Sequence, residues 1–162
     1  MRNIFSGLVM GLALGAVIGF GAGIYWFPFL FPPPAVNETV AEKETKTVLA
    51  KGRFIHADPS DSIHWGKGGV SVYEDLVHLE ADFQVGPGPK YHVYLVPEAD
   101  VGPQTEVEKT MFVDLGRLKA FEGSQNYPLP AGLDLKRYAS IVIWCEQFNQ
   151  LISPASIFIQ GR

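Results

Sequence analysis

The feature that most constrains this chain is a long uncharged run close to its N-terminus. Residues 4–31 carry no charged side chain, and Arg2 is the one charged side chain before Glu38. An α-helix rises ~1.5 Å per residue, so about twenty apolar residues cross the ~30 Å hydrocarbon layer of a bilayer. We therefore expect one transmembrane helix and assign residues 1–31 to an N-terminal membrane anchor.

A cleavable signal peptide is the alternative interpretation of this run, because a basic residue followed by apolar residues also begins such peptides. The run is longer than the ~7–15 residues of a signal-peptide core, and no Ala-x-Ala-like site ends it. It closes instead on aromatic residues that suit the membrane–water interface, namely Tyr25, Trp26, Phe27, Phe29 and Phe31. We expect an uncleaved anchor. Arg2 and the terminal amine favour a cytoplasmic N-terminus and a periplasmic or extracellular domain.

Within the run, glycine recurs at every fourth position, at Gly7, Gly11, Gly15, Gly19 and Gly23. On a helix this spacing makes one glycine groove, into which a second helix can pack closely. The alternative is that glycine is simply common in membrane helices. We expect the groove to support self-association or docking onto a partner helix.

Residues 32–50 have the composition of a linker. Pro32, Pro33 and Pro34 cannot continue a helix and favour an extended strut. The residues that follow are mostly polar and charged. We expect a spacer between the anchor and the remainder of the chain.

Residues 51–162 consist of short β-branched and aromatic runs separated by Gly, Pro, Asp and Asn. Apolar and polar residues alternate along residues 77–85, which is typical of a half-buried strand. Other strands are expected at residues 53–56, 70–73, 91–96, 111–115, 141–145 and 156–160. No stretch of a dozen residues has a helical period. We expect an all-β domain, an antiparallel β-sandwich or flattened barrel of about seven to eight short strands.

The charge of this domain limits its partners. After position 37 the chain has twelve basic and seventeen acidic residues. An acidic surface repels phosphate backbones, so we expect no nucleic-acid partner. The sequence also lacks a nucleotide-binding glycine loop and a Gly-x-Ser-x-Gly hydrolase motif. Whether the protein is an enzyme stays open.

Cys145 is the single cysteine and ends the most apolar predicted strand. Outside the cytoplasm an unpaired cysteine suggests an intermolecular disulfide, a metal ligand or a reactive thiol. The alternative is a small buried apolar side chain. Four histidines are available as further ligands: His56, His64, His78 and His92. The cysteine with two of them could hold copper or zinc, or ligate haem iron. No two of them have the His-x-His or His-x3-His spacing of a metal pair, so the cofactor stays unassigned.

Taken in order, the motifs of the domain resemble the DM-thirteen domain, also called the electron-transfer DM domain. The similar segments extend from about residue 52 to residue 157 and include Gly52-x-Phe54, His64, Leu79-Glu80-Ala81-Asp82-Phe83, Gly86-Pro87, His92-Val93-Tyr94-Leu95, Leu115-Gly116-Arg117-Leu118-Lys119, Gly123-Ser124-Gln125-Asn126-Tyr127-Pro128-Leu129-Pro130 and Tyr138-Ala139-Ser140-Ile141-Val142-Ile143-Trp144-Cys145. Here Gly88-Pro89-Lys90 follows the Gly-Pro turn, where the family usually has an acidic residue.

The resemblance implies a β-rich extracytoplasmic domain whose lone cysteine takes part in redox or electron-transfer chemistry. It points to Cys145 as the redox thiol, with Trp144 beside it and His64 as a neighbour of the site. Relatives often accompany DOMON domains and membrane-bound b-type cytochromes, so a redox partner would act in trans. The alternative functions are a non-catalytic binding or adhesion module and an accessory subunit of a membrane complex.

Overall fold

The structure is a computed structural model, and it describes residues 2–159. The chain forms two compact units, Met1–Pro32 and Pro33–Arg162. All the strands belong to the second unit. The segments that resemble the DM-thirteen domain, including the one that ends at Cys145, therefore all lie within the second unit.

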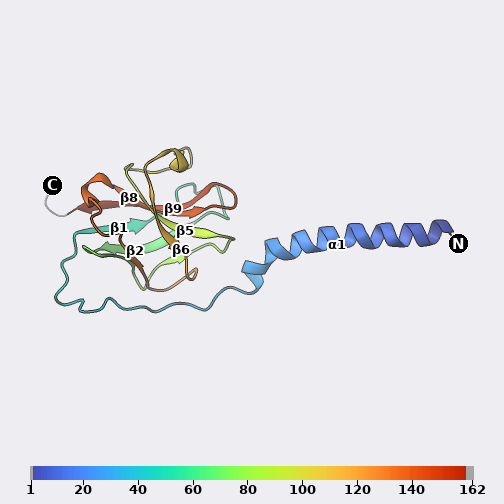
Figure 1. Cartoon of the computed structure of the whole chain (residues 1–162), viewed down its shortest axis with the longest axis horizontal. Helices are drawn as coiled ribbons and strands as arrows, with labels where there is room; N and C mark the ends of the chain where they lie inside the picture. The colour runs from blue at the N-terminus through green and yellow to red at the C-terminus, as the bar shows by residue number, and fades with distance from the viewer. Residues whose placement is uncertain (1, 160–162) are drawn as a thin grey trace. The chain divides into compact units, whose positions relative to one another are not determined.

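The first unit is built around one helix, α1, from Arg2 to Leu30 (Figure 1). Within residues 2–159, Ile4–Leu30 is the one helical segment long and apolar enough to cross a bilayer. Its apolar side chains are exposed, as at Leu14 and Ile18. Pro28 lies in the last turn, and the helix ends two residues later. The expected single apolar N-terminal helix is confirmed.

The five glycines of the predicted groove all lie on α1. A Cβ atom added at any of them would meet no atom within 4 Å, so the groove is open along its length. Room for a second helix is therefore available. Its pairing with such a helix stays a prediction.

The second unit is an antiparallel β domain. Its strands are β1 (Ala50–Phe54), β2 (Gly66–Val72), β3 (Leu76–Leu79), β4 (Gln84–Val85), β5 (Tyr91–Val96), β6 (Val113–Arg117), β7 (Gln125–Pro128), β8 (Ser140–Cys145) and β9 (Gln150–Ile159). Two short 3-10 turns, η1 (Val107–Lys109) and η2 (Leu135–Arg137), interrupt the loops.

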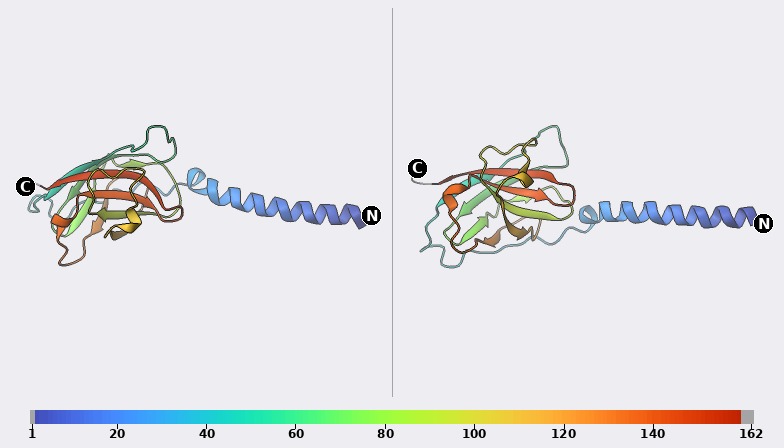
Figure 2. Two further views of the ribbon diagram at one scale, coloured as in Figure 1. Left: turned by 90° about the horizontal axis from the view of Figure 1, so that it is seen from above. Right: turned by 45° about the horizontal axis from the view of Figure 1, so that its top comes forward.

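Eight of these strands follow one another in the order β6-β5-β8-β9-β1-β2-β3-β7, and β4 pairs with β2. β9 has ten residues, and it pairs with β8 through its first part and with β1 through its last. The sheet curls around a common interior, as the two views of Figure 2 show. The result is a nearly closed barrel-like sheet, which confirms the predicted all-β flattened barrel.

The strand expected over residues 77–85 is divided into β3 and β4. The Phe83 N–H donates to the Glu80 carbonyl (2.9 Å) and closes a turn. Asp82 holds this turn against β2, because its Oδ1 accepts from the Gly69 N–H (2.8 Å). Alternation of apolar and polar residues continues across the turn, so the pattern alone does not reveal the break.

Apolar side chains are buried on both faces of β8. Ile141, Ile143 and Cys145 belong to the large core cluster inside the barrel. Val142 and Trp144 belong to a second cluster on the other face of the strand. The two clusters explain why every residue of β8 is buried and why its sequence is apolar without alternation.

Residues 36–40, which we call the strap, run along residues 122–126, the segment that leads into β7 and the first residues of that strand. The Val36 N–H donates to the Glu122 carbonyl (3.3 Å), and the Glu38 N–H donates to the Ser124 carbonyl (2.9 Å). Val40 is buried. Part of the predicted linker is therefore packed onto the β domain.

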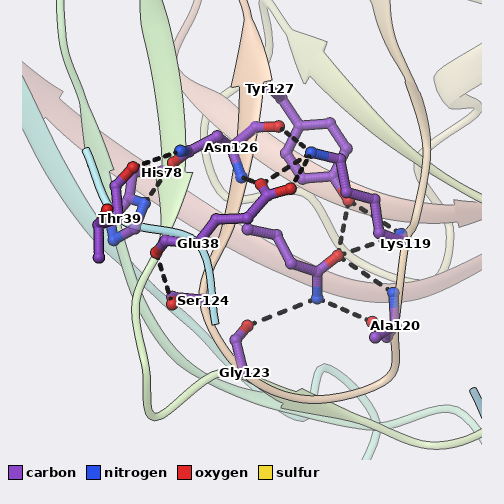
Figure 3. A network of polar contacts seen from close by, with 10 residues as sticks. Glu38, Thr39, His78, Lys119, Ala120, Gly123, Ser124, Asn126 and Tyr127 are labelled. Atoms are coloured by element: carbon purple, nitrogen blue, oxygen red, sulfur yellow. Dashed lines mark hydrogen bonds and ion pairs between the residues drawn. The ribbon is translucent and has the colours of Figure 1, made fainter. Parts of the chain in front are cut away.

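Glu38 is the centre of the strap's polar contacts (Figure 3). Its carboxylate accepts from the Lys119 ammonium (2.7 and 2.8 Å) and from the Asn126 N–H (2.6 Å). The Asn126 side chain donates to the Thr39 carbonyl (2.9 Å). The neighbouring Gln125 side chain is buried and fully hydrogen-bonded to backbone groups. Its oxygen accepts from the Lys119 and Ala120 N–H groups, and its nitrogen donates to the Ala120 carbonyl. These contacts fix the strap to β7.

Candidate functional site

Cys145 is the last residue of β8, and its side chain points into the barrel, where 1% of its surface is exposed. It pairs with Tyr91 on β5. The thiol donates a hydrogen bond to the Pro89 carbonyl (Sγ to O, 3.2 Å). The predicted redox thiol is therefore a buried group that is held at a defined position.

Burial raises the pKa of Cys145 above its ordinary value, because it disfavours the charged thiolate. The backbone N–H groups of Phe148 and Gln147 point toward the sulfur and act in the opposite direction, and the Glu146 carboxylate adds to the rise. The combined effect raises the pKa of Cys145. At neutral pH the resting group is a protonated thiol.

The turn at residues 86–89 lies at the thiol through the Pro89 carbonyl, and the loop of residues 61–65, which we call the covering loop, packs against this turn. A Cβ at Gly88 would overlap the Tyr91 hydroxyl, and a Cβ at Gly86 would overlap the Ile63 carbonyl and the Trp65 indole. The Gly86 N–H also donates to the Trp65 carbonyl (3.0 Å). Glycine is therefore required at both positions for the loop, the turn and the strand to stack closely.

His64 belongs to the covering loop and is paired with Asp61. The imidazole Nδ1 lies 2.5 Å from Asp61 Oδ2, and the backbone N–H groups of Ile63 (2.8 Å) and His64 (3.1 Å) donate to Oδ1. The hydrogen bond from His64 is the largest cause that lowers the pKa of Asp61, to about 2. Asp61 is therefore a firmly charged group within the loop.

Tyr91 connects the environments of Cys145 and of the covering loop. Burial is the main cause that raises the pKa of its phenol, and Cys145 and Asp61 both add to it through their charges. Tyr91 thus lies within electrostatic reach of both groups. No direct contact between His64 and Cys145 occurs among the contacts described for residues 2–159.

Trp144 is next to Cys145 in the chain but faces the opposite side of the sheet. It packs in the outer cluster with Tyr94 and Leu151. The indole therefore does not share the environment of the thiol.

A second group of ionisable residues lies on the outer face, next to Glu146. His92 Nδ1 lies 3.0 Å from Asp114 Oδ2, and its Nε2 lies 3.5 Å from Glu146 Oε2. One ligand atom from each of the three residues lies within 4.8 Å of the others. In the part of the chain that the structure describes, this is the one such group of three, and Cys145 is not a member.

Sequence reasoning missed this group. Spacing rules search for two histidines on one element, whereas these three residues come from β5, β6 and the turn after β8. The alternation of residues 91–96 places His92 on the polar face of its strand, but nothing in the sequence gives the partners of that strand.

Comparison with known families decides the identity of the domain. The family described as Electron transfer DM13 matches residues 59–157. The chain belongs to the electron-transfer DM13 family. No curated protein and no solved structure is significantly similar to it.

The DM13 match confirms the resemblance that the motifs indicated. It begins two residues before Asp61 and includes the Gly86–Pro89 turn, Cys145 and most of β9. The strap and β1 lie before the matched region. The covering loop, the glycine turn and the thiol are therefore all parts of the DM13 domain itself.

Proposed function

We propose that this protein is a membrane-anchored electron-transfer module in which Cys145 is the redox-active group and the redox partner acts in trans. The observation that carries the proposal is the set of polar groups around the sulfur. The Pro89 carbonyl accepts from the thiol, and the Gln147 and Phe148 N–H groups favour the thiolate. A cysteine that only fills space needs none of these contacts, whereas a group that changes its protonation state uses both kinds.

The chemistry that suits this arrangement is thiol–disulfide exchange with a disulfide on the partner. The Cys145 thiol loses its proton to solvent, and the thiolate attacks one sulfur of the partner disulfide. The partner's S–S bond breaks as the new S–S bond forms. The second partner sulfur leaves as a thiolate with the bonding electron pair, so the Cys145 sulfur is oxidised into a mixed disulfide and the leaving sulfur of the partner is reduced.

Access to the thiol depends on the covering turn. Cys145 is buried, and the Pro89 carbonyl lies on it. Exchange therefore requires the turn to move away, and a partner that displaces the turn would reach the sulfur. The cover protects the thiol from unspecific oxidation, because oxidation follows thiolate character and exposure.

We further propose that α1 is an uncleaved anchor with its N-terminus in the cytoplasm and that the DM13 domain lies in the periplasm or the extracellular space. The position of Arg2 before the apolar run supports this orientation. An intact-mass measurement on protein extracted from membranes should give the mass of the whole chain. A mass that lacks the apolar run would identify a signal peptide instead.

The thiol can be tested on the full chain in detergent, because Cys145 is the single cysteine. An aromatic disulfide reagent should label one equivalent per chain, slowly at about pH 7 and faster at higher pH as thiolate forms. Gly88→Ala should accelerate labelling severalfold, since the added Cβ meets the Tyr91 hydroxyl and disturbs the cover. Gly102→Ala is the matched control, because a Cβ there meets nothing within 4 Å.

The redox role is tested in cells that contain the natural partner. Cys145→Ser keeps a donor for the Pro89 carbonyl and should leave the fold intact, yet it should abolish a mixed disulfide seen on non-reducing gels. Labelling at the rate of global unfolding in both wild type and Gly88→Ala would contradict the proposal. A loss of several kcal/mol on Cys145→Ser would do so too, and the binding-module interpretation would then replace it.

A further inference from the structure

We propose that His92, Asp114 and Glu146 form a binding site for a first-row divalent transition-metal ion on the outer face of the barrel, with Zn²⁺ as its simplest ligand. The three residues come from three different elements: β5, β6 and the turn after β8. The site does not depend on the redox role of Cys145, whose side chain lies on the inner face.

The sheet itself brings the three side chains together. His92 pairs with Trp144 across β5 and β8, and the Glu146 N–H donates to the Lys90 carbonyl (3.2 Å), which places Glu146 beside the start of β5. On the other side, a register shift between β5 and β6 occurs at His92 and brings Asp114 to the imidazole. Irregular pairing of this kind often re-aims a side chain.

The donor set suits zinc and its neighbours. One imidazole and two carboxylates are ligands that Zn²⁺ accepts at ~2.0–2.2 Å, and three protein ligands leave a position for water or a partner group. Mg²⁺ and Ca²⁺ prefer sites made of oxygen alone, so the imidazole selects against them. The ligand atoms lie within 4.8 Å of one another. They would close to roughly 3.4 Å around a tetrahedral ion.

Further contacts hold the carboxylates in place. Asp114 Oδ1 accepts from the Gly116 N–H (2.8 Å), and Glu146 Oε1 accepts from the Tyr94 hydroxyl (3.0 Å). Asp114 Oδ2 lies at Nδ1 of His92 and Glu146 Oε2 lies at Nε2. An ion would therefore bind one of the two ring nitrogens, and the carboxylate at the other nitrogen would have to move toward it. Second contacts that fix the orientation of a ligand are a regular property of metal sites.

Lys90 is the competitor of the ion. Its ammonium lies 3.3 Å from Glu146 Oε2, the same oxygen that faces His92. A bound cation would replace Lys90 at this oxygen, so removal of the Lys90 charge should strengthen metal binding. The alternative is an ion-pair cluster of imidazolium, lysine and two carboxylates with no affinity for metal. In that cluster, removal of the Lys90 charge creates no binding.

The test is a Zn²⁺ titration of the full chain in detergent, without an affinity tag, at neutral pH and against a chromophoric chelator. His92→Ala and Asp114→Asn each remove a ligand, so each should weaken binding by at least the about ten- to hundredfold that loss of a group supporting a ligand costs. Lys90→Gln should tighten binding severalfold. The gain on Lys90→Gln cannot arise from unfolding. His56→Gln is the matched histidine control, since its ring contacts the Asp61 carbonyl rather than a carboxylate (2.6 Å).

Cys145→Ala separates this site from the redox proposal. It should leave Zn²⁺ affinity unchanged, because the thiol is not a member of the group. Loss of Zn²⁺ binding in Cys145→Ala, or equal affinities in wild type, His92→Ala and Asp114→Asn, would overturn the site. So would an absence of binding in both wild type and Lys90→Gln. The thiol-labelling result is independent of each of these outcomes.

Discussion

Helix α1 and strand β8 are both strongly apolar, yet they use their side chains in opposite ways. Leu14 on the helix is 59% exposed, whereas Ile143 on the strand is fully buried. The strand's side chains find partners within the chain on both faces. Most of the apolar side chains of the helix are exposed instead, and Ile4–Leu30 is long and apolar enough to cross a bilayer. Apolar composition alone does not distinguish these two cases; the length of the run does.

The largest expected effect comes from shortening an apolar side chain in each region. Ile143→Ala should lower the free energy of unfolding of the β domain by about 2–5 kcal/mol, because it leaves a cavity in the core. Leu14→Ala should leave it unchanged. Urea denaturation of the full chain in detergent, followed by tryptophan fluorescence, measures both.

Equal losses for the two variants would break the comparison between α1 and β8. They would mean that α1 packs on the β domain rather than in lipid. A loss below 1 kcal/mol for Ile143→Ala would instead contradict the described core.

The strap offers a third case, in which polar contacts rather than apolar burial hold a segment. Glu38→Gln should destabilise the domain by about 2 kcal/mol, because the charge that accepts from Lys119 and from the Asn126 N–H is lost. Glu44→Gln is the matched control, since Glu44 is exposed and outside the strap. The same denaturation measurement applies. Identical midpoints for the two variants would show that the strap contributes no stability.

The smallest effect is expected from the loop that covers the candidate site. The pKa of Asp61 is about 2 in the folded protein, below its ordinary value of 3.8. Asp61 therefore stabilises the fold above that ordinary value, and this contribution is lost as the pH falls toward about 2. We expect Asp61→Asn to cost about 1 kcal/mol at neutral pH and to flatten the acid limb of the stability curve.

Denaturation midpoints measured from neutral to acid pH check the Asp61 prediction. The groups that face Asp61 are His64 and Asp58 within the loop and Tyr91 on β5. Glu74→Gln, at an exposed residue outside the loop, is the control. If the acid limb of the stability curve is the same in Asp61→Asn as in the wild type, the hydrogen-bonded pair of Asp61 and His64 does not stabilise the fold.

The sequence predicts β5 and β8 with nearly correct bounds, shifts the bounds of other strands such as β1, and misses β7. Residues 91–96 and 141–145 are predicted as strands, and they form β5 and nearly all of β8, where apolar side chains are buried on both faces of the sheet. β7 was missed. Its residues Gln125 and Asn126 are polar, and they are held by hydrogen bonds to the segment before β7 and to the strap. Such a strand has no apolar pattern to detect.

The candidate site was predicted in part for a related reason. Cys145 stood out because it is single, and His64 does belong to the loop that covers this end of the barrel. Trp144 is the chain neighbour of Cys145, and its side chain lies on the opposite face of the sheet because successive residues of a strand alternate between faces. The grouping of His92 with Asp114 and Glu146 depends on strand order and on a register shift, and neither can be derived from spacing along one sequence.

The strap also has a consequence for aggregation. β7 ends the strand order of the sheet, and an uncovered edge of this kind can pair with a strand of another molecule. The strap covers the start of this edge: Val36 and Glu38 donate to the Glu122 and Ser124 carbonyls just before β7, and the Glu38 carboxylate accepts from the Asn126 N–H on β7. A recombinant fragment that begins at Lys51 would expose these groups, so a soluble form of the domain should begin before Val36.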